Sequence, residues 1–334
     1  MKLLEISHLK KSYDGIIAVD DLSFRVEAGE VFGLLGPNGA GKTTTMTMVA
    51  GLMEPDSGSI FIDGQRFHPG NLELKRTIGV VPQELAIYPH LTASENLDFF
   101  GQLYGLRGRH LRLQVDSALE QTGLADHARK PTETFSGGMK RRLNFAVALL
   151  HQPGLVILDE PTVGVDPQSR HHLLNSVHQL SQAGTAVVYA SHYMEEVEAI
   201  CHRVVIIDHG RMIACGELDQ LLNTLKMDLR LRVSGSTAEL TERLKGLTNV
   251  EIVSRQTANR SHTTYSGSVD VLSNGDATIV INPNSRNGRS GLTESLSRVI
   301  QILDESHIEL HSVDTQDSNL ERLFLKLTGH SLRD

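Results

Sequence analysis

The chain has 334 residues, which is long for one domain and comfortable for two. It is 40% apolar and 22% charged, and its formal net charge of −8 argues against nucleic acid or an anionic lipid surface as the main partner. The first residues lack the apolar core of a signal peptide, and no run approaches the roughly 18 apolar residues of a membrane helix. We therefore expect a protein that meets a membrane only through a partner.

The predicted elements begin with two strands, residues 3 to 9 and 22 to 27, with a turn at Asp20-Asp21. A third apolar run, residues 31 to 35, feeds a glycine-rich stretch, and the residues after that stretch can continue as a helix. The stretch has the pattern G-x-x-x-x-G-K-[ST] and consists of Gly36, Pro37, Asn38, Gly39, Ala40, Gly41, Lys42, Thr43 and Thr44. A strand, this turn and then a helix form the context that a phosphate-binding loop requires.

Each part of this loop suits a nucleotide. The glycines let the backbone curl so that its N–H groups, together with the helix N-terminus, form an anion site. Lys42 adds a positive charge for the β- and γ-phosphates, and the Thr43 hydroxyl is a ligand for Mg²⁺. The loop therefore predicts a bound nucleoside triphosphate with Mg²⁺, and a tight turn with an incidental lysine is the alternative.

The middle of the chain alternates apolar strands and helices, as an α/β fold should. The pattern predicts strands at 78 to 82, 155 to 158 and 186 to 190, a helical region from 92 to 128, and helices at 139 to 150 and 169 to 182. The basic residues 140 to 142 and the pair His171-His172 are interpreted as solvated helix faces, because a metal pair would need i, i+4 spacing and further ligands.

Two carboxylates follow the predicted strand at 155 to 158. Beside the phosphate loop, Asp159 can hold Mg²⁺ through water, and Glu160 would point to the space beyond the γ-phosphate. There Glu160 can take a proton from an attacking water molecule, as a general base must. Two acidic residues after a strand also occur in ordinary turns, so the phosphate loop upstream is what favours the catalytic interpretation.

A second glycine-rich motif, Ser136-Gly137-Gly138, stands at the start of the predicted helix at 139 to 150. A serine and two glycines at a helix N-terminus can bind an anion, although they also make an ordinary helix cap. Three further candidates are unremarkable singly: Tyr13 in a turn, Gln83 after one strand and His192 after another.

The only two cysteines, Cys201 and Cys215, bracket a predicted hairpin that turns at His209-Gly210. Such a turn is expected to place Val204, and not Cys201, opposite Cys215. We therefore expect two free thiols, which are typical of a reducing compartment.

The pattern changes near residue 222. The elements predicted after it are strands at 229 to 233, 250 to 254, 277 to 282 and 308 to 313, with helices at 238 to 247, 292 to 305 and 319 to 327. The first six follow the order β-α-β-β-α-β, which is typical of a split-βαβ, ferredoxin-like fold. We predict a domain at residues 1–222 and a small α+β accessory domain at 223–334, with a regulatory or dimerisation role.

Together the motifs resemble the nucleotide-binding subunit of ABC transporters. They stand in that family's order between residue 1 and about 220: Tyr13, the phosphate loop, Gln83, Ser136-Gly137-Gly138, Asp159-Glu160, Asp166 and His192. The resemblance implies a P-loop ABC cassette with a helical signature subdomain, and hydrolysis of ATP that drives separate transmembrane permease subunits. It also implies a position at the cytoplasmic face of the cell membrane, held by the permease, and a second ATP-binding subunit, taken here as an identical copy.

The same resemblance implies residue roles. Tyr13 would stack on adenine, Gln83 would touch Mg²⁺ or the attacking water and link to the permease, and His192 would hold the γ-phosphate and the water. Ser136 to Gly138 would close on ATP held by the second copy, and Asp166 would couple the two sites. The predicted catalytic set is Lys42, Gln83, Glu160 and His192, and the predicted Mg²⁺ ligands are Thr43, Gln83 and Asp159.

Two positions depart from the family's pattern: Met139 stands where the signature usually ends in glutamine, and Val163 where serine is usual. The Met-Lys-Arg-Arg continuation and the tail over residues 317 to 329 resemble the branch that exports drugs and lipids. Two alternatives remain, an importer ATPase and a soluble ABC ATPase of translation or DNA repair. The latter usually carries two cassettes or a long coiled-coil insertion, and this chain has neither. The transported compound is not indicated, because the permease selects it.

Overall fold

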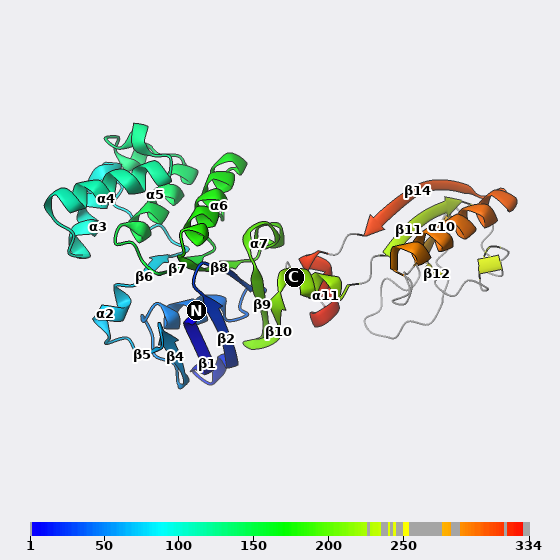
Figure 1. Ribbon diagram of the computed structural model, residues 1–334, viewed down its shortest axis with the longest axis horizontal. Helices are drawn as coiled ribbons and strands as arrows, with labels where there is room; N and C mark the ends of the chain where they lie inside the picture. Colours follow the sequence, from blue (N-terminus) through cyan, green and yellow to red (C-terminus); the bar gives the residue numbers. More distant parts are fainter. Residues whose placement is uncertain are drawn as a thin grey trace. The chain divides into compact units, whose positions relative to one another are not determined.

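The computed structural model describes residues 2–225, 228–234, 240, 243–244, 250–253, 276–281, 288–316 and 319–329 (Figure 1). The chain divides into two compact units, one that runs to Leu221 and resumes at Leu320, and one of Leu222–Asn319. Most of the helix predicted at 238 to 247 lies outside the described residues. Among the described residues, no helix combines the length and the apolar character needed to cross a membrane.

A six-stranded sheet in the order β10-β9-β3-β8-β7-β6 organises the first unit (Figure 1). Its strands are β3 (Val31–Leu35), β6 (Ile78–Val81), β7 (Leu155–Asp159), β8 (Ala186–Ser191), β9 (Arg203–Asp208) and β10 (Arg211–Glu217). All neighbouring pairs are parallel except β9 and β10. Every residue of β3, β7 and β8 is buried, which explains why these strands are continuous apolar runs in the sequence.

The second sheet of this unit is antiparallel, in the order β2-β1-β4-β5. Its strands are β1 (Lys2–Tyr13), β2 (Ile16–Glu27), β4 (Ser57–Ile62) and β5 (Gln65–Phe67). The turn predicted at Asp20-Asp21 is wrong, because the chain turns between Tyr13 and Ile16 and β2 runs through both aspartates. The pairing of β1 with β2 has an irregular register at Asp21, which has φ +61°. Asp21 Oδ1 lies 2.8 Å from His8 Nδ1.

Eight helices belong to the continuous part of the chain before residue 225. They are α1 (Lys42–Val49), α2 (Leu72–Lys75), α3 (Ala93–Leu103), α4 (Gly108–Gln121), α5 (Gly137–Leu149), α6 (Pro167–Gln182), α7 (Met194–Ile200) and α8 (Leu218–Asn223), with short 3₁₀ turns at Ala125–His127 and Thr132–Thr134. Helices α3, α4 and α5 gather together, as Figure 1 shows, around buried residues that include Leu97, Leu119 and Leu143. The helical region predicted from 92 to 128 is thus two helices, separated where Gly105 and Gly108 adopt positive φ.

The hairpin of β9 and β10 turns at His209-Gly210, as predicted. The predicted partner of Cys215 is wrong: a register shift between Met212 and Ala214 places Val205 opposite Cys215, and Val204 opposite Gly216. Both thiols are nevertheless free, as expected. Burial raises the pKa of the Cys201 thiol, so this side chain packs as a small apolar group.

The second unit contains an antiparallel sheet in the order β12-β13-β11-β14. The described strands are β11 (Asp228–Ser234), β12 (Val250–Val253), β13 (Asp276–Ile281) and β14 (Glu309–Gln316), and the described long helix is α10 (Gly288–Glu305). Leu229, Leu231 and Val233 alternate along β11 and share one core with Val299 and Leu303 of α10. The period-2 pattern predicted for this strand is therefore confirmed.

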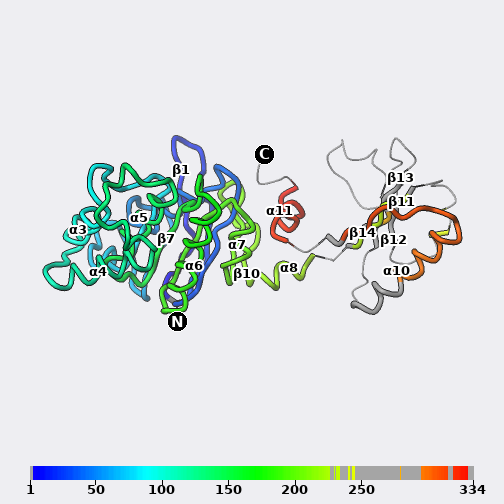
Figure 2. Tube along the Cα trace, turned by 90° about the horizontal axis from the view of Figure 1, so that it is seen from above, coloured from blue at the N-terminus to red at the C-terminus, as the bar shows by residue number. Residues whose placement is uncertain are grey.

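The last helix, α11 (Leu320–Thr328), returns to the first unit. It lies against α7, as Figure 2 shows with α11 in red, and its first backbone N–H donates to the Glu198 carboxylate. Leu320, Leu323 and Phe324 are buried there. The accessory domain predicted from the sequence, residues 223–334, includes this helix, whereas contacts in the structure group it with the first unit.

This packing gives a stability prediction. Phe324 is fully buried, so Phe324→Ala should lower the free energy of unfolding of the first unit by about 3–5 kcal/mol. The matched control is Leu325→Ala, because the neighbouring Leu325 is 49% exposed and its change should stay within about 0.5 kcal/mol. Urea unfolding followed by circular dichroism measures both, and equal effects would contradict the docking of α11 on α7.

Candidate functional site

The glycine-rich loop leaves the buried strand β3 and enters α1, in the order that its sequence predicts. Gly39 and Gly41 have φ of +80° and +101°, a region that favours glycine. A Cβ atom at Gly41 would lie 2.4 Å from the carbonyl oxygen of Ala18, and one at Gly36 would lie 2.4 Å from that of Ile207. The loop therefore needs glycine for both its backbone angles and its close packing.

A cavity of about 270 Å³ lies over this loop. Its wall consists of Ala18, Pro37, Asn38, Gly39, Gly41, Lys42, Thr43, Thr44, Gln83, Glu160, Val163 and His192. Gln83, Glu160 and His192 follow β6, β7 and β8. The carboxyl ends of parallel strands meet at one edge of a sheet, and this is why residues so far apart in sequence share one wall.

Lys42 lies at the base of the cavity and is only 6% exposed. Its Nζ donates to the carbonyl oxygens of Gly36 at 2.7 Å and Pro37 at 3.1 Å, and it lies 3.6 Å from Glu160 Oε1. Burial lowers the pKa of the Lys42 ammonium, while the neighbouring charge of Glu160 raises it. The ammonium is therefore held by two carbonyl groups of the phosphate loop, and it faces the carboxylate of Glu160.

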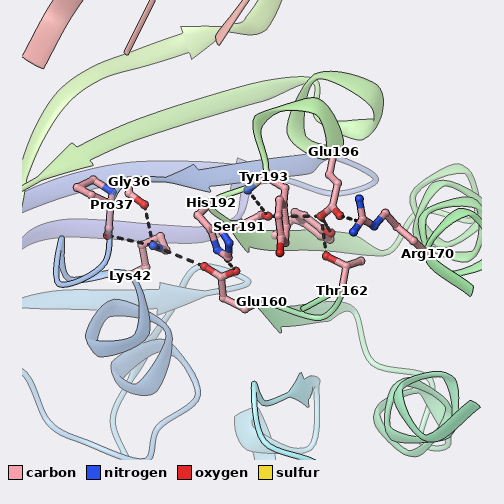
Figure 3. Close-up of polar contacts among 11 residues, drawn as sticks. Gly36, Pro37, Lys42, Glu160, Thr162, Arg170, Ser191, His192, Tyr193 and Glu196 are labelled. Atoms are coloured by element: carbon pink, nitrogen blue, oxygen red, sulfur yellow. Dashed lines mark hydrogen bonds and ion pairs between the residues drawn. The ribbon is translucent and has the colours of Figure 1, made fainter. Parts of the chain in front are cut away.

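Glu160 and His192 form the closest polar pair of the cavity wall. Glu160 Oε2 and His192 Nδ1 are 2.6 Å apart (Figure 3). Glu160 has φ +50°, which is uncommon outside glycine, and its N–H donates to the Ala190 carbonyl at 3.0 Å. This backbone turn directs the carboxylate toward Lys42 and His192 instead of along the strand.

Asp159 lies behind the loop, beside Thr43. Its Oδ1 is buried and has no hydrogen-bond partner among the described residues. Burial raises the pKa of the Asp159 carboxyl, while a hydrogen bond from Thr43 and the charge of Lys42 lower it. A buried carboxylate oxygen without a partner next to a hydroxyl suits Mg²⁺, which takes oxygen ligands. The residues present therefore fit a magnesium ion.

Two arginines of α5, predicted to lie on a solvated face, bind backbone carbonyls, and one of them holds Gln83. The Arg141 guanidinium donates to the Gln83 carbonyl oxygen, and Arg142 Nη1 donates to the carbonyls of Thr122 and Gly123 at 3.0 and 3.1 Å. The expectation of a solvated face is thus wrong for Arg141 and Arg142, which are both half-buried. A run of basic residues at the start of a helix does not by itself show whether these side chains are solvated or bind backbone carbonyls. His171 and His172 are exposed, as expected.

The second glycine-rich motif lies outside the cavity wall. Ser136 begins α5 and accepts the Met139 N–H at 3.2 Å, and both Ser136 and Gly137 are exposed. A Cβ atom at Gly138 would lie 2.7 Å from Asp166 Oδ2, so the motif lies directly against the start of α6. Asp166 begins that helix, and its carboxylate accepts the Ser169 N–H at 2.9 Å, which lowers the pKa of Asp166.

Tyr13 also lies outside the wall, at the end of β1. It is 42% exposed, and its hydroxyl donates to Met53 Sδ at 2.9 Å. Of the two departures from the family pattern, Val163 lies in the wall and Met139 packs on the core of α3 to α5. The structure thus brings together the phosphate loop, Gln83, Glu160 and His192, and leaves Tyr13, Ser136 to Gly138 and Asp166 apart from them.

A buried strand, a glycine-rich loop and a buried lysine facing two carboxylates define a nucleotide-binding protein of the phosphate-loop class. The family model described as "ABC transporter" matches residues 19–163. The solved "Structure of ATP binding subunit of ABC transporter" is 33% identical to this chain and has a TM-score of 0.61. The match covers 66% of this chain and 92% of that structure's chain.

Three relatives extend the similarity. The linearmycin resistance ATP-binding protein LnrL of Bacillus subtilis (strain 168) is 43% identical over 334 residues, 99% of this chain and 100% of that protein. The daunorubicin/doxorubicin resistance ATP-binding protein DrrA of Streptomyces peucetius is 35% identical over 336 residues, 100% of this chain and 94% of that protein. The Nod factor export ATP-binding protein I of Burkholderia thailandensis is 43% identical over 213 residues, 64% of this chain and 70% of that protein.

This chain belongs to the family of ABC transporter ATP-binding proteins. It is an ATPase whose activity is coupled to transport, and its relatives are ATP-binding proteins of drug resistance and export. The alternative of an ATPase in translation or DNA repair finds no support among these relatives.

Asp159 gives a prediction about pH. Burial raises the pKa of its carboxyl above the ordinary 3.8, so the native state binds this proton more tightly than the unfolded state. The charged carboxylate therefore lowers the free energy of unfolding at pH values above the raised pKa and has no such effect below pH 3.8. Asp159→Asn should therefore raise the melting temperature of protein free of ATP and Mg²⁺ near neutral pH, by an amount that shrinks as the solution is acidified. Thermal unfolding in EDTA across this pH range tests it, and a gain that does not change with pH would contradict the burial argument.

Proposed function

We propose that water attacks the γ-phosphate of ATP in this cavity with Glu160 as the general base. The observation that supports this is the position of the Glu160 carboxylate, 3.6 Å from Lys42 Nζ and 2.6 Å from His192 Nδ1. A phosphate group bound by Lys42 would place its attacking water at the Glu160 side of the wall. Glu160 takes the proton of that water, and Lys42 stabilises the charge on the phosphoryl oxygens.

His192 is proposed to hold the γ-phosphate and the water. Its Nδ1 faces Glu160, so the other ring nitrogen remains for a phosphate oxygen. Thr43, Asp159 and Gln83 are proposed to hold Mg²⁺, which when bound neutralises charge on the β- and γ-phosphates. Tyr13 is proposed to stack on adenine, since its half-exposed ring has free surface beyond the loop.

The general base is tested by Glu160→Gln. This change keeps the shape of the side chain and removes its proton affinity, so hydrolysis should fall roughly 10²–10⁴-fold while ATP binding persists. Glu195→Gln, at an exposed position in the first turn of α7, is the control and should keep normal turnover. Turnover and ATP binding are measured on the same preparations, and near-normal hydrolysis by Glu160→Gln would move the base elsewhere.

We further propose that two copies share each ATP site. Ser136 and Gly137 lie exposed at a helix N-terminus, outside the wall that contains Lys42. One triphosphate needs one such loop to be held, so the second is best explained as a cap for ATP bound to another copy. Asp166, which packs against Gly138, is proposed to couple the two sites.

The shared site separates two residues by their effects. Lys42→Ala should weaken ATP binding to a single copy, whereas Ser136→Arg should leave that binding intact and block hydrolysis by placing bulk and charge in the facing surface. Ser57→Arg, at an exposed position of β4, is the matched control and should hydrolyse ATP normally.

The shared site also predicts that wild-type activity per chain rises with protein concentration until dimers dominate. A rate that stays constant down to concentrations where light scattering detects only monomer would refute the shared site.

The remaining proposals concern partners. We propose that the chain drives a separate transmembrane permease from the cytoplasmic face of the membrane, and that it exports its cargo, on the strength of its similarity to resistance and export proteins. Residues 223–319 are proposed to form an accessory regulatory or dimerisation domain of the ferredoxin-like type. The antiparallel order β12-β13-β11-β14 with α10 supports this assignment.

A further inference from the structure

A buried carboxylate that the proposed mechanism does not use lies behind the catalytic pair. Glu196 of α7 is 3% exposed. Its carboxylate faces four polar partners: Thr162 Oγ1 at 2.7 Å, Tyr189 Oη at 2.6 Å, Ser191 Oγ at 3.4 Å and, as an ion pair, Arg170 Nε at 3.3 Å (Figure 3). Burial raises the pKa of the Tyr189 phenol, which therefore stays protonated as a donor. The three hydroxyls all donate to Oε2, whereas Oε1 has the ion pair with Arg170 and no hydrogen-bond partner among the described residues. Three donors and one opposite charge hold this carboxylate in position.

Two of these partners lie close to Glu160 and His192 in the chain. Thr162 follows Glu160 by two positions, in the segment that leads to α6. Ser191 directly precedes His192, and its Oγ also accepts the Tyr193 N–H at 2.9 Å. Glu196 thus fastens the chain just after the proposed base and the turn that presents the histidine.

Arg170 adds a third attachment, from α6. Its guanidinium lies 5.1 Å from the centre of the Tyr193 ring while its Nε pairs with Glu196. The arrangement therefore ties α6, the loop after β7 and the turn after β8 to one side chain. None of these atoms lines the nucleotide cavity.

We propose that Glu196 is a positioning residue for hydrolysis: it sets the relative placement of Glu160 and His192, whose side chains meet at 2.6 Å. This inference rests on the roles proposed above for those two residues. A glutamine at position 196 would have the same size, but its amide has one acceptor oxygen and no charge for Arg170. The three hydroxyls all donate to the same oxygen, Oε2, so the glutamine NH₂ group would face either the Arg170 guanidinium or these hydroxyls. The common anchor of the loop after Glu160 and the turn before His192 is then weakened, and a displacement of about 1 Å can cost on the order of 10²-fold in rate.

The test compares Glu196→Gln with a second buried carboxylate in the full-length protein. Glu30 is also buried and also pairs with one arginine, with its Oε1 3.1 Å from Arg203 Nη1, but it precedes β3 at the end of that strand away from the phosphate loop. We expect Glu30→Gln and Glu196→Gln to lower the melting temperature alike. Only Glu196→Gln should reduce kcat, by roughly tenfold or more, with the Kd for ATP and the KM within about twofold of wild type.

A kcat loss for Glu196→Gln no larger than that of Glu30→Gln would overturn the proposal. If Glu196→Gln does not fold, Thr162→Val decides, because it keeps the shape of that side chain and removes only its hydroxyl. A fall in kcat at unchanged Kd supports the proposal, and a normal kcat overturns it. Glu160→Gln, measured in parallel, separates the two hypotheses: an active Glu160→Gln refutes the proposed base, whereas an inactive Glu160→Gln beside a normal Glu196→Gln refutes only the positioning role.

Discussion

The parallel pairing of the central strands is the constraint on which the site depends. Leu35 pairs with Ser191, and Asp159 with Ala190, so the ends of β3, β7 and β8 are level at one edge of the sheet. A shift of one residue in any of these three strands, which are fully buried, would turn its side chains to the other face of the sheet. Core packing therefore fixes the spacing between the phosphate loop, Glu160 and His192.

The same edge concentrates buried charge. Lys42 has a lowered pKa and Asp159 a raised one, and in both cases burial is the largest cause. Burial therefore makes the charged form of each side chain less favourable in the nucleotide-free protein. The positive charge of Lys42 is complementary to a triphosphate, and the negative charge of Asp159 is complementary to Mg²⁺. A ligand that completes such a site stabilises the native state by mass action, so the cost of burying these groups is offset when the nucleotide is bound.

Local patterns predicted the parts of this protein whose physical cause is local. The phosphate loop follows from backbone angles that only glycine adopts easily, and the central strands follow from burial on both faces. The prediction failed where distant residues decide the outcome: the register shift that absorbs Asp21, the half-buried Arg141 that binds the Gln83 carbonyl, and the docking of Leu320 at Glu198. The contacts of Glu196 could not be predicted either, because its partners come from three separate segments of the chain.

Helix α7 is a short helix that tertiary contacts hold in place. Its seven residues are too few to be helical on their own. Its structure depends on three tertiary contacts: the Glu196 network on one side, Val197 in the core, and α11 at Glu198. The turn that carries His192 lies between the buried strand β8 and this helix, which begins two residues later. The last helix of the chain therefore packs on the element that follows the histidine, although it supplies no side chain to the cavity wall.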